Sequence, residues 1–288
     1  MPEPERIRIV TDSMAWIPDE LAREHHIKVV PLHVHFGEET FTEGVDLSNQ
    51  DFYRRLGEAQ ALPKTSQPSP GEFGAAFLEV AEGATAILAV HASAKLSGTI
   101  RSAEIAAAAV RTERAGLRIE VLDTQQIATA EGIVAIRAAE AAASGAAFDD
   151  VIIQARDLAA KPRILVCVET LEYLQRGGRI GRAQAFLGGL LHVRPILCVA
   201  DGEVVPKERV RSRSRAIERF LDLMAEYAQG RPFGHVGVLH AEAADVGREL
   251  EQAVRSRFRI QRLIVTEIGP VIGTHVGPGA FAVTYHCD

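Results

Sequence analysis

Short apolar segments alternate with helical patterns through the first 160 residues of the chain. The apolar segments at residues 7–10, 86–91 and 118–122 have the length of β-strands, and helix signals follow each of them. Strands that alternate with helices favour parallel pairing, with the helices packed on the faces of the sheet. The alternation therefore predicts an N-terminal α/β domain with a parallel sheet over residues 1–160.

The second half of the chain has a different pattern. Residues 194–199 and 203–210 are strand-like and flank the dipeptide Asp201-Gly202. Asp-Gly between two strands is typical of a tight antiparallel hairpin. With the strands and helices that follow, the hairpin predicts a C-terminal α/β domain with a mixed sheet over residues 161–288. The expected fold class is α/β, in two domains.

Residue types also predict individual elements. Ser69, Pro70 and Glu72 are the types preferred at the N-cap, first and third positions of a helix, and Ser48 predicts a second helix start. Three other segments are less regular.

Residues 28–36 predict one continuous strand, and a helix is expected after Gly181 and through Leu191. Residues 268–279 are rich in glycine and predict a loop around His275.

The composition excludes several classes of protein. Hydrophobic residues make up 47% of the chain and charged residues 24%, the balance of a folded globular protein. Lys+Arg 32 against Asp+Glu 38 gives a net charge of −6, which argues against a nucleic-acid-binding surface. No apolar run approaches the ~18 residues of a membrane span. Residues 1–6 are polar and lack a signal core, so we expect a cytoplasmic protein.

Cysteines and histidines give no strong metal signature. Cys167, Cys198 and Cys287 are widely spaced and odd in number, so we expect structural thiols rather than disulfides or a metal site. His33 and His35 alternate along a strand pattern and share a face, but no third ligand accompanies them, and solvated histidines are expected. We therefore expect neither a metal nor a cofactor.

Three hydroxyl-rich segments follow a strand or precede a helix: Thr11-Asp12-Ser13, Thr65-Ser66 and Ser97-Gly98-Thr99. Parallel sheets place ligands at such loops, and a hydroxyl beside the free N–H groups of a helix start can bind an anion. Each segment taken alone is better explained as a helix cap.

Two glycine-rich segments hold a basic side chain each. Arg179 lies within residues 176–181, and His275 lies between Gly273 and Gly277. A cation or an imidazole on such backbone is typical of a ligand site, and tight packing with solvated side chains explains the pattern equally well.

Common catalytic and nucleotide-binding motifs are absent from the sequence. Neither GxGxxG nor GxxxxGK[ST] occurs, and the nucleophile elbow GxSxG is missing. A serine-dependent hydrolase or transferase that uses Ser97 and His275 stays open, but it needs a carboxylate behind His275.

Five segments together resemble the DegV family. They are Thr11-Asp12-Ser13, residues 64–69, residues 96–99, residues 176–181 and residues 275–280, and they occur in the family's order. The resemblance implies two α/β domains that bind a long-chain fatty acid. It also implies a role as the fatty-acid-binding subunit of a bacterial fatty acid kinase. In that role the protein is no enzyme itself. It presents the carboxylate to a separate ATP-dependent kinase subunit, which makes an acyl phosphate for phospholipid metabolism. Such a carrier would meet a membrane surface transiently.

The resemblance also assigns roles to particular residues. Thr65 and Ser97 are expected to hydrogen-bond the fatty acid carboxylate, and His275 is expected close to it. Arg179, and less securely Arg176, match the basic positions that would support phosphoryl transfer. The remaining neighbours of the carboxylate are expected to be Ser66, Gly98 and Thr99. Arg194 stands where the family pattern suggests lysine, which keeps the charge.

Three functions follow from these patterns. The first is a fatty-acid carrier for acyl-phosphate formation, the second is the Ser97 hydrolase or transferase, and the third is a binding module for another small carboxylate or phosphate.

Overall fold

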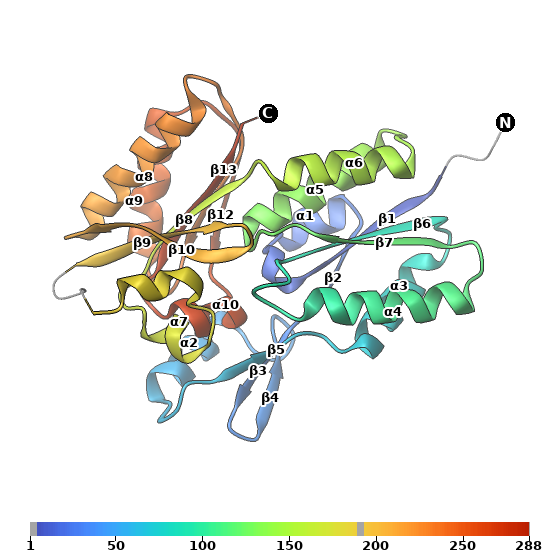
Figure 1. The fold of residues 1–288 in the computed structure, drawn as a ribbon, viewed down its shortest axis with the longest axis horizontal. Coiled ribbons are helices and arrows are strands. Elements are labelled where there is room, and N and C mark those ends of the chain that lie inside the picture. Colours follow the sequence, from blue (N-terminus) through green and yellow to red (C-terminus); the bar gives the residue numbers. More distant parts are fainter. Residues whose placement is uncertain (1–4, 189–192, 288) are drawn as a thin grey trace. The chain divides into compact units, whose positions relative to one another are not determined.

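The computed structural model describes residues 5–188 and 193–287 and contains two compact units (Figure 1). The first unit comprises the chain up to His33 together with Ser66–Ala160, and the second comprises Val34–Thr65 and the chain from Lys161 onward. The chain therefore passes from one unit to the other after residues 33, 65 and 160. The first four of the polar N-terminal residues 1–6 lie outside the described residues.

Residues 34–65 make the units differ from the predicted domains 1–160 and 161–288. They group with the second unit, since the Tyr53 hydroxyl donates to the carbonyl oxygen of Ile268 (2.8 Å). The backbone N–H of Val271 also donates to the Glu43 carboxylate (2.9 Å). Whether the two predicted halves fold as separate domains stays a prediction.

The first unit is built around a four-stranded parallel sheet with the strand order β2-β1-β6-β7. Its strands are β1 (Ile7–Asp12), β2 (Ile27–Val30), β6 (Ala86–His91) and β7 (Arg118–Asp123). Its helices are η1 (Ser13–Ala15, a 3-10 turn), α1 (Asp19–Glu24), α3 (Pro70–Ala81), α4 (Thr99–Glu113), α5 (Thr129–Ala143) and α6 (Phe148–Ala159). Helices α3 and α4 cover one face of the sheet and α5, backed by α6, covers the other, which confirms the predicted parallel α/β architecture (Figure 1).

The second unit contains a six-stranded mixed sheet with the order β10-β9-β8-β13-β11-β12 and a three-stranded sheet with the order β4-β3-β5. The strands are β3 (His33–Phe36), β4 (Glu39–Thr42), β5 (Lys64–Ser66), β8 (Arg163–Cys167), β9 (Arg194–Ala200), β10 (Glu203–Val210), β11 (Phe233–His240), β12 (Ile260–Glu267) and β13 (Phe281–His286). The helices are α2 (Asn49–Glu58), α7 (Glu172–Arg176), η2 (Gly181–Phe186, a 3-10 helix), α8 (Arg213–Ala228), α9 (Ala244–Arg257) and α10 (Pro270–Val276). Only β11 and β12 pair in parallel in the larger sheet, which confirms the predicted mixed sheet.

Local chemistry explains the helix starts and the hairpin. Ser69 forms a complete capping box with Glu72 at the start of α3, and Ser48 caps α2 through the N–H of Asp51. The hairpin between β9 and β10 turns at Asp201, which has a φ of 52°, and at Gly202, which has a φ of 76°. Left-handed backbone at both central residues is the geometry that an Asp-Gly hairpin turn requires.

Two predicted elements were wrong. Residues 28–36 form two strands in different sheets, because Pro31 lies between β2 and β3 and has no N–H to continue a ladder. The helix expected after Gly181 is only the short η2, which ends at Phe186. Gly181 and Gly188 have positive φ angles of 51° and 96°, which an α-helix does not accommodate. The end of the predicted helix, at Leu191, lies outside the described residues.

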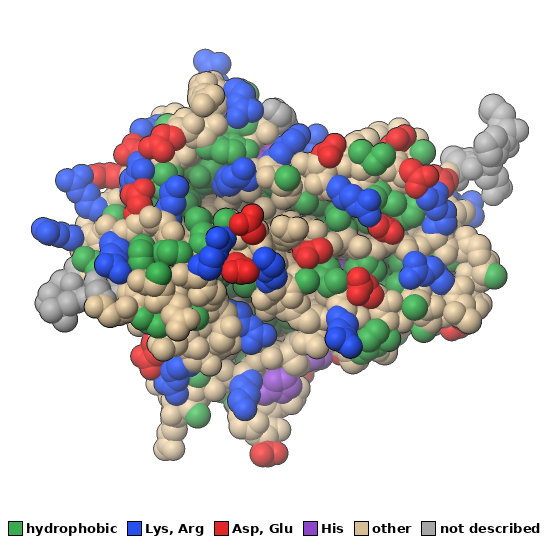
Figure 2. Space-filling model, viewed as in Figure 1, with side chains coloured by type: hydrophobic (Ala, Val, Ile, Leu, Met, Phe, Trp, Pro, Cys, Tyr) green, Lys and Arg blue, Asp and Glu red, His purple; other side chains and the backbone are tan. Residues whose placement is uncertain are grey.

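The surface carries both signs of charge. Figure 2 shows Lys and Arg side chains interspersed with Asp and Glu over the visible face. No helix within residues 5–188 and 193–287 is long and apolar enough to cross a membrane.

Candidate functional site

Thr65 and His275 lie together in the second unit although 210 positions separate them in the sequence. Thr65 is the middle residue of β5, and His275 occupies the last turn of α10. The Thr65 Oγ1 and His275 Nε2 atoms are 2.9 Å apart, a hydrogen-bond distance. His275 is thus held by a short helix, where a loop was expected. Pro270 at the first helical position begins α10, and Gly277 follows its end with a φ of 73°.

The glycine-rich segment after α7 packs directly against the imidazole. A Cβ atom at Gly177 would lie 2.3 Å from His275 Nδ1, so only glycine leaves room for the ring. The Arg179 guanidinium donates to the Gly177 carbonyl oxygen (2.9 Å). Burial and the Arg179 cation lower the pKa of His275 to about 4. The imidazole is therefore neutral at physiological pH.

Arg176 differs from Arg179 in its surroundings. Its side chain is 52% exposed and pairs with Glu172 one helical turn earlier (3.0 Å). Such an exposed pair along α7 contributes little to stability. Within this unit, Arg179 rather than Arg176 acts on His275.

Two hydroxyl side chains, those of Ser97 and Thr99, lie together at the start of α4 in the first unit, with Gly98 between them in the sequence. The Ser97 Oγ and Thr99 Oγ1 atoms are 2.8 Å apart, and the Thr99 side chain is fully buried. Gly98 is the N-cap residue of α4 and supplies no side-chain cap. A Cβ atom there would lie 2.9 Å from Gln67 Nε2, so glycine permits close approach of Gln67.

Ser66 is the half-buried last residue of β5 and belongs to the first unit. Ser66, Ser97, Gly98 and Thr99 thus lie in one unit, and Thr65, Arg179 and His275 lie in the other. The peptide bond between Thr65 and Ser66 joins the two groups covalently.

The third hydroxyl-rich segment has an internal role. Thr11 and Asp12 are fully buried, and the Asp12 carboxylate accepts the N–H of Met14 (3.0 Å) in η1. Ser13 Oγ accepts the N–H of Leu32 (3.1 Å). This segment therefore closes a turn, as the capping interpretation predicts.

Sequence analysis missed a buried polar cluster formed by Asp12, His91 and Glu131. All three side chains are fully buried, and one oxygen or ring nitrogen of each lies within 4.8 Å of the others. A sequence signal existed, since Glu131 is the one acid in the apolar first half of α5. An acid at a core position needs a partner, which only the fold identifies.

The remaining histidine and cysteine expectations concern residues outside these groups. His33 Nε2 lies 2.9 Å from Glu72 Oε1, and His35 Nδ1 lies 2.9 Å from Thr40 Oγ1, so the two rings bond to different partners. Among the described residues the three cysteines form no disulfide; Cys167 and Cys287 are buried and Cys198 is half-buried.

The surroundings of Ser97 and His275 bear on the hydrolase hypothesis. A catalytic triad places a carboxylate behind the histidine, where it stabilises the imidazolium. His275 instead faces the Arg179 cation, and its Nδ1 abuts Gly177. These neighbours disfavour a charged imidazole and so work against general-base catalysis by His275.

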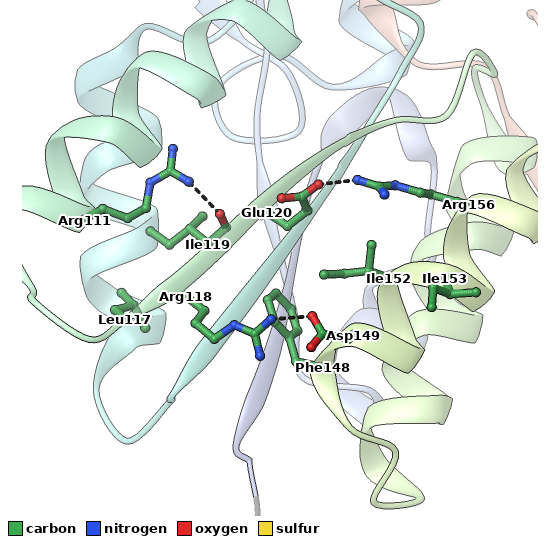
Figure 3. A pocket seen from close by; sticks show the side chains of 10 residues that line it. All are labelled: Arg111, Leu117, Arg118, Ile119, Glu120, Phe148, Asp149, Ile152, Ile153 and Arg156. Atoms are coloured by element: carbon green, nitrogen blue, oxygen red, sulfur yellow. Dashed lines mark hydrogen bonds and ion pairs between the residues drawn. The ribbon is translucent and has the colours of Figure 1, made fainter.

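A surface groove of about 540 Å³ lies elsewhere on the first unit, beside the edge strand β7 (Figure 3). Ion pairs Arg118–Asp149 and Arg156–Glu120 cross it between β7 and α6. The Arg111 guanidinium donates to the Ile119 carbonyl oxygen (3.0 Å) on the β7 edge. The predicted site residues do not line this groove.

Comparison with known proteins covers nearly the whole chain. A family model described as "Uncharacterised protein, DegV family" matches residues 6–287. A DegV domain-containing protein of Streptomyces coelicolor is 38% identical over 279 residues, which are 96% of this chain and 97% of the relative.

Two solved structures are similar to this protein over nearly the full length of both chains. A DegV family protein from Thermus thermophilus, described as binding fatty acid, has a TM-score of 0.92 at 34% identity, covering 98% of this chain and 100% of that one. DegV of Bacillus subtilis, described as a fatty acid binding protein, has a TM-score of 0.87 at 34% identity, covering 99% and 100%. The sequence motifs, the fold and these matches agree, and the chain belongs to the DegV family.

Proposed function

We propose that this protein binds a long-chain fatty acid and presents its carboxylate to a separate ATP-dependent kinase for acyl-phosphate formation. The observation that carries the proposal is the hydrogen bond between Thr65 and the neutral His275. The fatty-acid-binding description of two relatives with TM-scores of 0.92 and 0.87 supports the choice of ligand.

The neutral imidazole determines what Thr65 can offer a ligand. If His275 Nε2 carries the proton, it donates to Thr65 Oγ1, and the threonine hydroxyl is then left to donate to a carboxylate oxygen. His275 would thus orient the hydroxyl without adding a positive charge. A carboxylate held by hydroxyl donors instead of an ion pair keeps its nucleophilic oxygen available for a phosphoryl group.

Ser97 offers a second hydroxyl donor. Its Oγ is fixed by Thr99, and it lies at the N-terminus of the 15-residue helix α4, where backbone N–H groups and the helix dipole favour an anion. Ser66 and Gly98 complete the proposed surroundings of the carboxylate.

The tail would supply most of the binding free energy. Each buried methylene is worth about 0.8 kcal/mol, so a long acyl chain contributes roughly 10 kcal/mol before the costs of association. The polar head then fixes the orientation of the ligand rather than its affinity.

Arg179 is proposed to act during phosphoryl transfer. Hydroxyl groups already satisfy the bound carboxylate, and the planar guanidinium suits phosphoryl oxygens. Arg179→Ala is expected to retain fatty-acid affinity within about tenfold while losing most acyl-phosphate formation with a cognate kinase. Exposed Arg176→Ala is the matched comparison and should change both readouts less. Loss of lipid binding by Arg179→Ala with an intact fold would assign Arg179 to carboxylate pairing.

Organic extraction of the purified protein, followed by gas chromatography, tests the ligand class. We expect about one non-covalent long-chain fatty acid per chain. Native mass spectrometry separates the alternatives, since an acyl ester on Ser97 would indicate the hydrolase or transferase and a small polar ligand would indicate the third function. Absence of lipid, with no uptake of added fatty acid by the stripped protein, would refute the carrier function.

A further inference from the structure

The buried cluster of Asp12, His91 and Glu131 lies at the carboxyl ends of two adjacent strands of the first unit. Asp12 ends β1 and His91 ends β6, and these strands pair in the centre of the order β2-β1-β6-β7. The chain leaves β1 toward β2 and leaves β6 toward β7, so the strand order reverses between them. Loops at such a reversal form the usual ligand site of an open α/β sheet.

The hydrogen bonds within the cluster leave one carboxylate oxygen without a partner. His91 Nδ1 lies 2.9 Å from Asp12 Oδ2, and the Thr11 hydroxyl donates to Glu131 Oε1 (3.2 Å). Within the described residues, Glu131 Oε2 is buried and has no hydrogen-bond partner, and the same is true of His91 Nε2. The Glu131 carboxyl group lies within hydrogen-bonding reach of the Asp12 carboxylate.

A proton on Glu131 resolves this arrangement. Two ionised carboxylates in contact repel each other, and a buried carboxylate oxygen without a donor is costly. If Glu131 is protonated, its hydroxyl donates to Asp12, and both requirements are met. Burial and the Asp12 charge raise the pKa of Glu131 well above its ordinary value, in agreement with this geometry.

The elements packed around Glu131 present few other charges. Strand β1 contributes Asp12 and the half-buried Arg8, β6 contributes His91, and β2 contributes Lys28, whose ammonium group pairs with Glu79. The turn η1 has no titratable side chain. The titratable residues of α6 are all exposed: Asp149, Asp150, Arg156 and Asp157.

The Glu131 carboxyl group also contacts the loop that carries Ser97. The backbone N–H of Ala92, the first residue after β6, donates toward it. Next in the chain, the Ser93 carbonyl oxygen accepts the N–H groups of Leu96 (2.9 Å) and Ser97 (3.1 Å). The position of Ser97 is therefore tied to the cluster through two hydrogen bonds, with the peptide bond between Ala92 and Ser93 joining them.

We propose that Asp12, His91 and Glu131 are a positioning cluster, which holds one proton between Glu131 and Asp12 and so fixes the start of the Ser97 loop. The inference rests on the proposed role of Ser97 in ligand binding. A divalent cation bound by the same three residues is the alternative occupant. The hydrogen bonds already present favour the proton, because Asp12 already engages His91 Nδ1 and Thr11 already engages Glu131 Oε1.

The test compares Glu131→Gln with Glu131→Leu, and Glu140→Gln on the same helix is the control. Gln keeps the shape and the donor of a protonated glutamate, whereas Leu removes both. Infrared spectra should show a protonated carboxylic acid in the wild type that only the Glu131 variants lose. Glu131→Gln should bind fatty acid within about twofold of the wild type, with an affinity that is flat from about pH 5 to about pH 8. Glu131→Leu should bind about tenfold more weakly and exchange the Ser97 amide hydrogen faster.

Three outcomes overturn the proposal. An infrared spectrum unchanged by Glu131→Gln would mean that Glu131 is ionised. One equivalent of a divalent metal per chain by elemental analysis, lost in the Gln variant, would make the cluster a metal site. If the Ser97 amide hydrogen exchanged at the wild-type rate in Glu131→Leu, Glu131 would not position the Ser97 loop. If the wild type binds no fatty acid at any pH, the proposed function fails, while the infrared and exchange measurements still decide the state of the cluster.

Discussion

At the scale of single residues, the neutral imidazole of His275 is the central feature of the candidate site. Burial and Arg179 both disfavour its charged form, so the ring orients Thr65 by hydrogen bonding alone. Sequence analysis expected His275 close to the carboxylate, and the lowered pKa of the ring favours a hydrogen-bonding role over a charged one.

Thr65→Val tests the hydroxyl. It removes a hydrogen bond to a charged ligand group at nearly constant volume, and we expect fatty-acid affinity to fall by about tenfold or somewhat more. Thr65→Ser retains the hydroxyl and should stay within a few-fold of the wild type. A fluorescent fatty-acid titration measures both. If Thr65→Val and the wild type bound the fatty acid with equal affinity, the Thr65 hydroxyl would not contact the ligand.

The lowered pKa of His275 predicts a pH dependence of stability. The unfolded chain takes up a proton on this ring near pH 6.5, and the native state does so only at about 4. The free energy of unfolding should therefore fall as the pH decreases through this window. His275→Asn should lack this part of the decrease, whereas His26→Asn at an exposed site should keep it. Parallel urea titrations at several pH values measure the difference, and identical profiles for wild type and His275→Asn would contradict the prediction.

At the scale of elements, the site depends on close contact between the end of α7 and the end of α10. Gly177→Ala is expected to displace the imidazole, since the added Cβ would lie 2.3 Å from Nδ1. Fatty-acid affinity should fall about as far as in Thr65→Val. Gly57→Ala in α2 is the control, because no atom lies within 4 Å of its added Cβ. It should raise stability by about 0.5–1 kcal/mol and leave binding unchanged. Equal fatty-acid affinity of Gly177→Ala and Gly57→Ala would show that the His275 imidazole can move aside without weakening binding.

Elements with a local chemical signal could be predicted from the sequence. Ser69 with Glu72 marks the start of α3, and Asp201-Gly202 marks the hairpin. Helix α10 was missed because it has only seven residues, one of them a glycine between two flanking glycines, and because it is fixed by contacts with α2 and α7, which lie far away in sequence. The contacts within the candidate site were likewise not predictable from local sequence. The resemblance named Thr65 and His275, but their hydrogen bond and the Glu131 cluster depend on long-range packing.

At the scale of the whole molecule, the chain enters the second unit twice. Phe52 of α2 is fully buried, and an added Cβ at Gly273 of α10 would lie 2.7 Å from its ring. Residues 34–65 therefore complete a core that the C-terminal part of the chain provides.

A fragment of residues 1–160 should accordingly fold only in part. We expect amide protection in β1, β6 and β7 and rapid hydrogen exchange throughout residues 34–65, since Tyr53 and Glu43 lose their partners Ile268 and Val271. Hydrogen exchange followed by mass spectrometry, with the full chain as control, measures this. Full protection of residues 34–65 in the fragment would instead support the predicted domain boundary.

Strand β7 ends the four-stranded sheet, and an exposed edge of this kind is a place where a second chain can add its own strand. The Arg118–Asp149 and Arg156–Glu120 pairs and the guanidinium of Arg111 occupy that edge. A strand from another molecule would have to break these contacts before it could pair. We therefore expect the ion pairs drawn in Figure 3 to hinder the addition of a strand at this edge, and this effect should weaken at high salt, where surface ion pairs are screened.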